Sequence, residues 1–201
     1  MVKRFGAAAL LAGTLLLVAG CGRKAPPAPP PAPVPTVNAS MTEVMAPNAQ
    51  TIWDISSHAF NEKGDGLDPA KLSAKDWAQL EDAGRQIRDR ALLLAQAPHV
   101  TAVGPGEHIM GEDASHPGVK GTWDAASPQQ VQALIDANPA LFAERARNLA
   151  KSGDRLVKAA PARDVKTLYE VSSNLDEDCD SCHQPFWGTD EPPPYPGAGG
   201  K

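Results

Sequence analysis

The chain has 201 residues, of which 42% are hydrophobic and 5% aromatic, and its formal net charge is −5. This acidic balance argues against nucleic acid as a partner and against an electrostatic grip on a bilayer. Because aromatic side chains are few, we expect the domain to gain part of its core from something bound inside it.

The first 20 residues have the features of a secretory signal peptide. Lys3 and Arg4 precede an apolar run, residues 5–20, that is too short and too rich in Gly and Ala for a membrane span. The sequence VAGC at 18–21 resembles the bacterial lipobox, in which the cysteine becomes the lipid-carrying first residue of the mature chain. We therefore expect lipidation of Cys21 and a periplasmic, membrane-anchored bacterial lipoprotein. The alternative is an ordinary cleaved signal with an incidental cysteine.

Proline-rich segments flank the expected domain. Residues 21–37 contain runs of Pro and Ala, so they predict a semi-rigid polyproline spacer between the lipid anchor and the domain. Residues 188–201 are rich in Pro and Gly and are expected to be disordered. The folded part is expected over residues 38–187, which is one domain by size. Cleavage after residue 20 would remove two of the 19 basic residues and leave a net charge near −7.

The first of four helical patterns begins near Ser40 and ends near Phe60. Ser40 and Glu43 have the spacing of a capping box, in which each side chain bonds the other's backbone N–H. Pro47 either kinks the first turns or marks a later helix start at Ala46, because proline has no N–H to donate.

The second and third patterns each begin with a capping signal. Ser73 with Asp76, and Ser127 with Gln130, have the spacing of N-cap and N3 residues. Pro139 should kink the third pattern or split it in two. The apolar stripes of these helices are Trp77, Leu80, Gly84, Ile87, Ala91 and Leu94 in the second, and Val131, Leu134, Asn138, Phe142, Leu149 and Leu156 in the third.

The fourth pattern, residues 161–187, carries the other two cysteines on its apolar stripe. That stripe consists of Val165, Leu168, Ser172, Leu175, Cys179 and Cys182. With a long loop at 99–126 between the second and third helices, the pattern predicts an all-α antiparallel four-helix bundle. A looser helical domain, in which the loop adds a small hairpin, is the alternative.

Cys179, Cys182 and His183 form a C-x-x-C-H motif, which is typical of covalent haem attachment. The two thiols would bond the vinyl groups of one haem c, and the imidazole would ligate its iron. Structural zinc usually takes four ligands, and no second cysteine pair is present. A thioredoxin-like pair belongs at a helix N-terminus, whereas this pair closes a helix. A disulfide between cysteines three apart on one helix would be strained.

A helical bundle whose last helix ends in C-x-x-C-H resembles the cytochrome c-prime family. The resemblance covers most of residues 38–187, and its specific part is CDSCHQPFW at the end of the last helix. The long loop, the prolines at 47 and 139, and the lipid-plus-proline leader depart from the family pattern. Family members often pair as dimers through their first two helices, so the resemblance also implies a homodimer as one assembly.

The resemblance implies two possibilities for the iron position opposite His183. Some members leave it open or shielded by an apolar residue and bind small gases, whereas the low-spin branch supplies a methionine from the first helix. Met41 is the preferred ligand here, since it lies nearest the helix start and, as in the low-spin relatives, six residues before a proline. Met45 is the alternative if Pro47 starts the helix, and Met110 is a distant third. Methionine also commonly serves as a flexible core filler.

We therefore expect a haem-bearing electron carrier, since His/Met-ligated iron has no open site and a raised potential. The acidic chain predicts a redox partner with a basic docking face. A gas-binding haem protein is the alternative. No nucleophile, base and orienting group gather in the sequence, so we do not expect an enzyme. The loop histidines His99, His108 and His116 are expected to be exposed.

Overall fold

The structure is a computed structural model, and it describes residues 34–107, 109 and 127–187. Within these residues the regular structure is helical, apart from one antiparallel bridge between Phe60 and Leu67, which confirms the expected all-α class. None of the described helices is long and apolar enough to cross a membrane. Cys21 with the signal peptide, Met110, most of the loop 99–126 and the tail 188–201 lie outside the described residues.

The first helical segment is continuous but changes its winding part-way. α1 (Val37–Ser40) leads into the π-helical turn η1 (Met41–Met45) and then into α2 (Ala46–Ala59). The N–H of Ala46 bonds the carbonyl of Met41, which is the wider π-type spacing. This turn directly precedes Pro47, so the helix accommodates a residue that cannot donate an N–H. The alternative in which the helix starts at Ala46 is therefore wrong, because the helical segment begins at Val37.

The capping box predicted at Ser40 and Glu43 is also wrong. The N-cap is Thr36, whose hydroxyl accepts a hydrogen bond from the N–H of Ala39 at 3.0 Å. Ser40 makes no cap bond; its hydroxyl donates to the carbonyl of Thr36 at 2.7 Å. Because the helix begins earlier than the sequence pattern indicated, Ser40 lies inside it and uses its side chain to bond back along the helix.

The remaining helices begin largely where the sequence predicts. A 3₁₀ turn, η2 (Pro69–Lys71), precedes α3 (Ala74–Gln96), and α4 (Pro128–Ala137) precedes α5 (Pro139–Ala162) and α6 (Val165–Phe186). Both predicted capping boxes, at the starts of α3 and α4, are present. The third pattern divides at Asn138, as one of the two readings of Pro139 expected. All six predicted stripe residues of α3 are buried.

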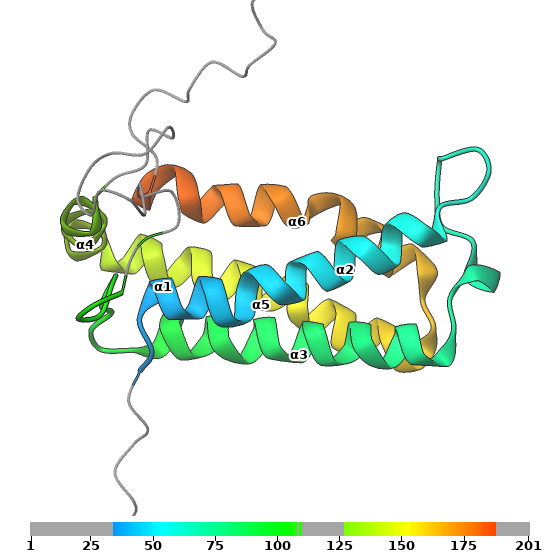
Figure 1. The fold of residues 1–201 in the computed structure, drawn as a ribbon, viewed down its shortest axis with the longest axis horizontal. Helices are drawn as coiled ribbons and strands as arrows, with labels where there is room; N and C mark the ends of the chain where they lie inside the picture. The colour runs from blue at the N-terminus through cyan, green and yellow to red at the C-terminus, as the bar shows by residue number, and fades with distance from the viewer. Residues whose placement is uncertain (1–33, 108, 110–126, 188–201) are drawn as a thin grey trace, which may run out of the picture. The chain divides into compact units, whose positions relative to one another are not determined.

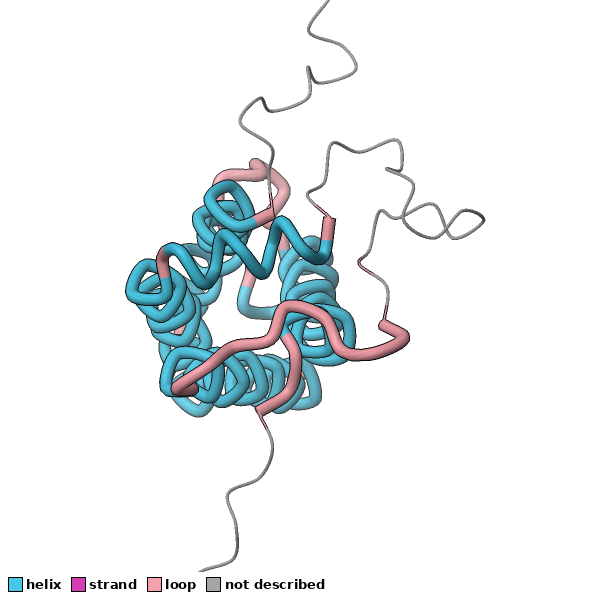
Figure 2. Tube along the Cα trace, turned by 90° about the vertical axis from the view of Figure 1, so that its left-hand side faces the viewer, coloured by secondary structure: helices cyan, strands magenta, loops and turns pink. Residues whose placement is uncertain are grey.

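The long helices α2, α3, α5 and α6 lie alongside one another, and consecutive ones run in opposite directions (Figure 1). Viewed along the length of these four helices, α4 runs across one end of the group (Figure 2). α3 and α5 make the most extensive contact of any pair. They approach closely at Gly84 and Gly153, where a Cβ added to Gly153 would lie 2.5 Å from the carbonyl oxygen of Gly84.

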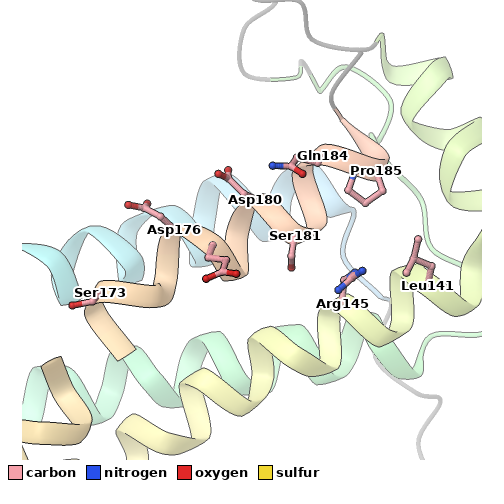
Figure 3. Close-up of a pocket in the computed structure, with 9 residues that line it drawn as sticks. Leu141, Arg145, Ser173, Asp176, Asp180, Ser181, Gln184 and Pro185 are labelled. Atoms are coloured by element: carbon pink, nitrogen blue, oxygen red, sulfur yellow. The ribbon is translucent and has the colours of Figure 1, made fainter. Parts of the chain in front are cut away.

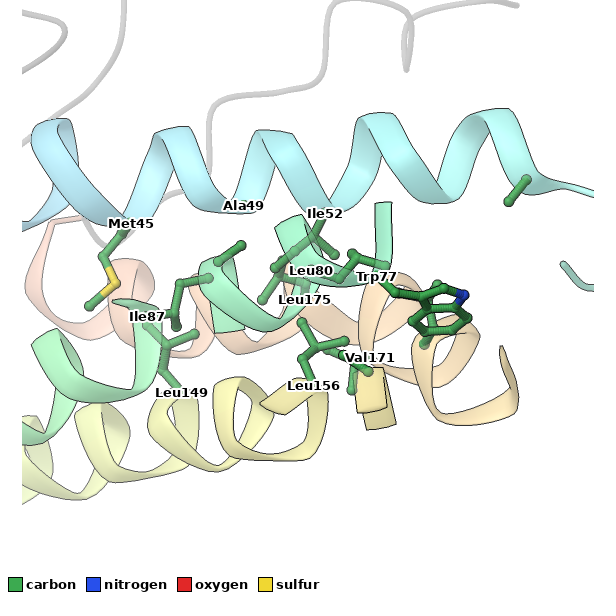
Figure 4. Close-up of a cluster of buried hydrophobic side chains, with 14 of the residues drawn as sticks. Met45, Ala49, Ile52, Trp77, Leu80, Ile87, Leu149, Leu156, Val171 and Leu175 are labelled. Atoms are coloured by element: carbon green, nitrogen blue, oxygen red, sulfur yellow. The ribbon is translucent and has the colours of Figure 1, made fainter. Parts of the chain in front are cut away.

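Two groups of buried apolar side chains form the core. The main cluster lies between the long helices and includes Ile52, Leu80 and Leu156 (Figure 4). The end cluster joins the last turn of α3, the following loop, α4, the start of α5 and the end of α6; it includes Leu94, Ile135 and Phe142. The end of α6 borders both clusters.

Candidate functional site

The C-x-x-C-H motif occupies the last turns of α6. Asp164 caps the start of this helix by accepting a hydrogen bond from the N–H of Thr167 at 3.1 Å. At the other end, the N–H of Trp187 bonds the carbonyl of His183 at 2.7 Å and ends the helix. The start of the first helical segment and the end of α6 lie at the same end of the long helices (Figure 1).

Cys179 and Cys182 lie where the two clusters meet. Both thiols are free and half-buried. Cys179 packs against the main cluster, whereas Cys182 packs against the end cluster. The one-turn step between the cysteines therefore spans the boundary between two apolar regions, as expected for residues on the inward stripe of α6.

The thiols are held in their protonated form. Burial raises the pKa of Cys179 to about 11, and the carboxylates of Asp176, Asp178 and Asp180 add to this effect. Burial also raises the pKa of Cys182 to about 11, although the charge of Arg145 opposes it. Because a thioredoxin-like pair depends on a readily formed thiolate, these values argue against that alternative.

His183 presents a neutral imidazole. The side chain is half-buried, and burial lowers its pKa, although the carboxylate of Asp180 opposes this effect. The ring packs edge-on against the indole of Trp187, with 5.0 Å between centroids. A neutral imidazole with a fixed ring is the form that ligates metals.

The two candidate methionines of the first helix have different surroundings. Met45 is buried, with 6% of its surface exposed, and belongs to the main cluster, where its side chain points between the helices (Figure 4). Met41 is half-buried and packs against the same cluster, as Cys179 does. Met41 is fully within the helix, because the helix begins at Val37.

Two buried hydrogen-bond donors near the motif have no acceptor among the described residues. They are Nε of Arg145 and Nε1 of Trp187. Trp187 contacts His183, and the charge of Arg145 acts on Cys182. Arg145 could not be recognised from the sequence, since an arginine on an amphipathic helix is normally a solvated residue, and its position beside α6 depends on the packing of the helices.

A groove of about 800 Å³ lies on the outer side of α5 and α6 (Figure 3). Carboxylates of α6 line it together with Arg145, but Cys179, Cys182 and His183 do not. The thiols and the imidazole of α6 therefore border the apolar clusters, while its acidic side chains border the groove.

A second hollow, of about 220 Å³, lies beside the end cluster. Its lining is largely apolar and includes His99, which is exposed as predicted. His108 and His116 lie outside the described residues. Among the described residues, no three His, Cys, Asp or Glu side chains are grouped to hold a metal ion.

No protein-family model, no curated protein and no solved structure matches this chain.

Proposed function

We propose that the chain is a c-type cytochrome that carries one covalent haem in an antiparallel four-helix bundle and transfers electrons. The observation that carries this proposal is the placement of Cys179, Cys182 and His183 together on the last turns of α6, where two apolar clusters meet. Nε of Arg145 and Nε1 of Trp187, beside the motif, are buried donors without an acceptor among the described residues, and they also fit a bound group with acceptors at its edge.

Cys179 and Cys182 would hold the haem through thioether bonds. Each S–H would add across one vinyl C=C bond of the haem, so that the sulfur bonds one carbon, the hydrogen goes to the other, and no external oxidant is needed. Free thiols, rather than a disulfide, are the form this addition needs. His183 would supply the nitrogen ligand to iron, and the bound group would supply one-electron oxidation and reduction.

The helices would supply the surroundings that make such a group a carrier. An apolar environment excludes water and disfavours additional positive charge on the iron. Met41 would supply the second side-chain ligand to the iron, since it lies at the same end of the long helices as the motif and is only half-buried. Met45 is fully enclosed by the core and is better suited to fill it.

Gas binding is the second candidate function. Met45 belongs to the main cluster and Met41 packs against it. Apolar packing therefore explains the position of both side chains, even if neither of them ligates the iron. If neither methionine ligates the iron, the bound haem would be able to take up small gases.

We further propose that the cytochrome is held at a bacterial membrane on the periplasmic side by lipid on Cys21 and by the spacer 21–37. Asp176, Glu177 and Asp180 lie on the outer side of α6, on the same helix as the motif. Their negative charge supports a redox partner with a basic docking face, because docking surfaces carry complementary charges.

Visible spectra of the purified exported protein test the choice between carrier and gas binder. The oxidised and reduced forms, and the reduced form under carbon monoxide, are recorded. A low-spin spectrum that carbon monoxide does not change supports the carrier. A high-spin spectrum that shifts under the gas supports the second candidate, and a protein without haem bands contradicts both.

A further inference from the structure

Arg145 contains a buried donor for which the described residues offer no acceptor. The side chain extends from α5 toward α6, at the level of Ser181 and Pro185 (Figure 3). Its Nε is shielded from solvent and has no hydrogen-bond partner within the part of the chain that the structure describes. Because a guanidinium remains protonated in proteins, a buried and unpaired N–H of this group is costly until an acceptor meets it.

The carboxylates that share a groove with Arg145 are not its partners. Asp176, Glu177 and Asp180 line the same groove as Arg145, but none of the three forms an ion pair with it. Asp176 and Asp180 point away from α5 (Figure 3). All three are exposed, so they can remain hydrated without a partner.

Arg145 lies beside the turn of α6 that carries the motif. Its side chain reaches the level of Ser181 (Figure 3), the residue directly before Cys182. Arg145 lies one helical turn after Leu141 and Phe142. Phe142 belongs to the end cluster, and Leu141 and Cys182 pack against it. The guanidinium is thus placed between the outer groove and the region beside the cysteine.

We propose that Arg145 binds a propionate carboxylate of the haem attached at Cys182, an inference that rests on the function proposed above. Haem carries two propionates at its rim, and its vinyl groups are used by the cysteines. A charge-assisted bond from Nε to one propionate would satisfy the buried donor and keep that carboxylate ionised. Arg145 is therefore a positioning residue for the cofactor.

The midpoint potential of the purified full-length holoprotein, measured against pH, tests this inference. Wild type should give a potential that changes little between about pH 5 and 8, because the paired propionate stays ionised throughout. In Arg145→Gln the potential should be lower at neutral pH, since a positive charge near the iron is lost, and should rise as the pH falls and the propionate becomes protonated. Arg147→Gln is the matched control, because Arg147 is exposed on the same helix.

Arg145→Lys should restore a flat profile, since it restores the charge. Among the described residues that line the groove with Arg145, the ionisable ones are Asp176, Glu177 and Asp180, and their charges are screened by water and salt because all three are exposed. Arg145→Gln with the same profile as Arg147→Gln and wild type would overturn the inference.

Arg145→Met, which keeps the aliphatic contacts, serves as a second neutral variant. A profile of potential against pH equal to that of wild type would again overturn the inference. If neither neutral variant accumulates as a coloured protein but Arg145→Lys does, the requirement for charge is supported. Loss of all three would instead indicate a packing role and overturn the inference. A wild-type protein without covalent pigment would contradict the proposed function itself, which separates the two failures.

Discussion

The indole of Trp187 packs edge-on against the imidazole of His183, with 5.0 Å between ring centroids and 76° between ring planes. The same pair is joined through the backbone, since the N–H of Trp187 bonds the carbonyl of His183. The indole therefore restricts how the imidazole can turn, and a ligand whose ring is fixed holds a metal in one geometry.

Replacing Trp187 by alanine should loosen the His183 ring. We expect Trp187→Ala to broaden the low-spin spectrum of the holoprotein and to increase its high-spin fraction, whereas Trp187→Phe keeps an aromatic edge and should stay close to wild type. Visible and paramagnetic resonance spectra of the oxidised proteins measure this. Equal spectra for the alanine and phenylalanine variants would contradict the positioning role.

Alanine variants of the two methionines in the first helical segment should differ in their effects on the spectrum and on the stability of the protein. Met41→Ala should give a high-spin spectrum that responds to carbon monoxide. Met45→Ala should keep the low-spin spectrum and lower the free energy of unfolding by about 2–5 kcal/mol, as expected for truncation of a buried side chain. Spectra and denaturant titrations of both variants decide the assignment. A spectral change in Met45→Ala alone would assign the ligand to Met45.

Glu107 should make the start of the first helix sensitive to acid. Its Oε2 accepts hydrogen bonds from the N–H of Gly104 at 3.0 Å and from the hydroxyl of Thr36 at 2.7 Å. These bonds, that of Gly104 first, lower its pKa below the ordinary value of 4.5. The carboxylate therefore adds stability that is fully present above that ordinary value and is lost as the pH falls through the lowered pKa.

Glu107→Gln should accordingly lower the free energy of unfolding by about 1 kcal/mol at neutral pH, as expected for a partly exposed hydrogen bond. The difference should disappear in acid below the lowered pKa, where wild type is also uncharged at this position. Glu62→Gln is the control, because Glu62 is exposed. Denaturant unfolding at several pH values measures both, and a difference independent of pH would refute this account of Glu107.

Gly153 should be intolerant of any side chain. A Cβ there would lie 2.5 Å from the carbonyl oxygen of Gly84 and 2.8 Å from the backbone nitrogen of Arg88, so α3 and α5 would have to separate. We expect Gly153→Ala to destabilise the protein by about 1–3 kcal/mol. In an open helical position the same change would stabilise it by about 1 kcal/mol. The sign of the change in a thermal or denaturant melt therefore decides the matter.

The sequence was most informative where structure depends on neighbouring residues. The capping boxes Ser73–Asp76 and Ser127–Gln130 are present because each needs only local spacing. The box expected at Ser40 is absent because Thr36 provides an earlier cap and the helix continues through a π turn. Local rules could not anticipate that combination.

The residues around the candidate site divide in the same way. The inward placement of Cys179 and Cys182 follows from the helical repeat of α6 and was predicted. The close approach of Gly84 to Gly153 and the position of Arg145 beside α6 depend on which helices pair. That pairing is a property of tertiary packing, which no single segment of sequence contains.

Covalent retention of pigment tests the central claim most directly. The exported protein is denatured in acid and extracted with organic solvent, alongside a variant with Cys179→Ser and Cys182→Ser. The account predicts that colour stays with the wild-type polypeptide, on a proteolytic peptide that contains residues 179–183, and that the double variant yields none. A colourless wild-type protein, or pigment that leaves it for the solvent, would contradict the account.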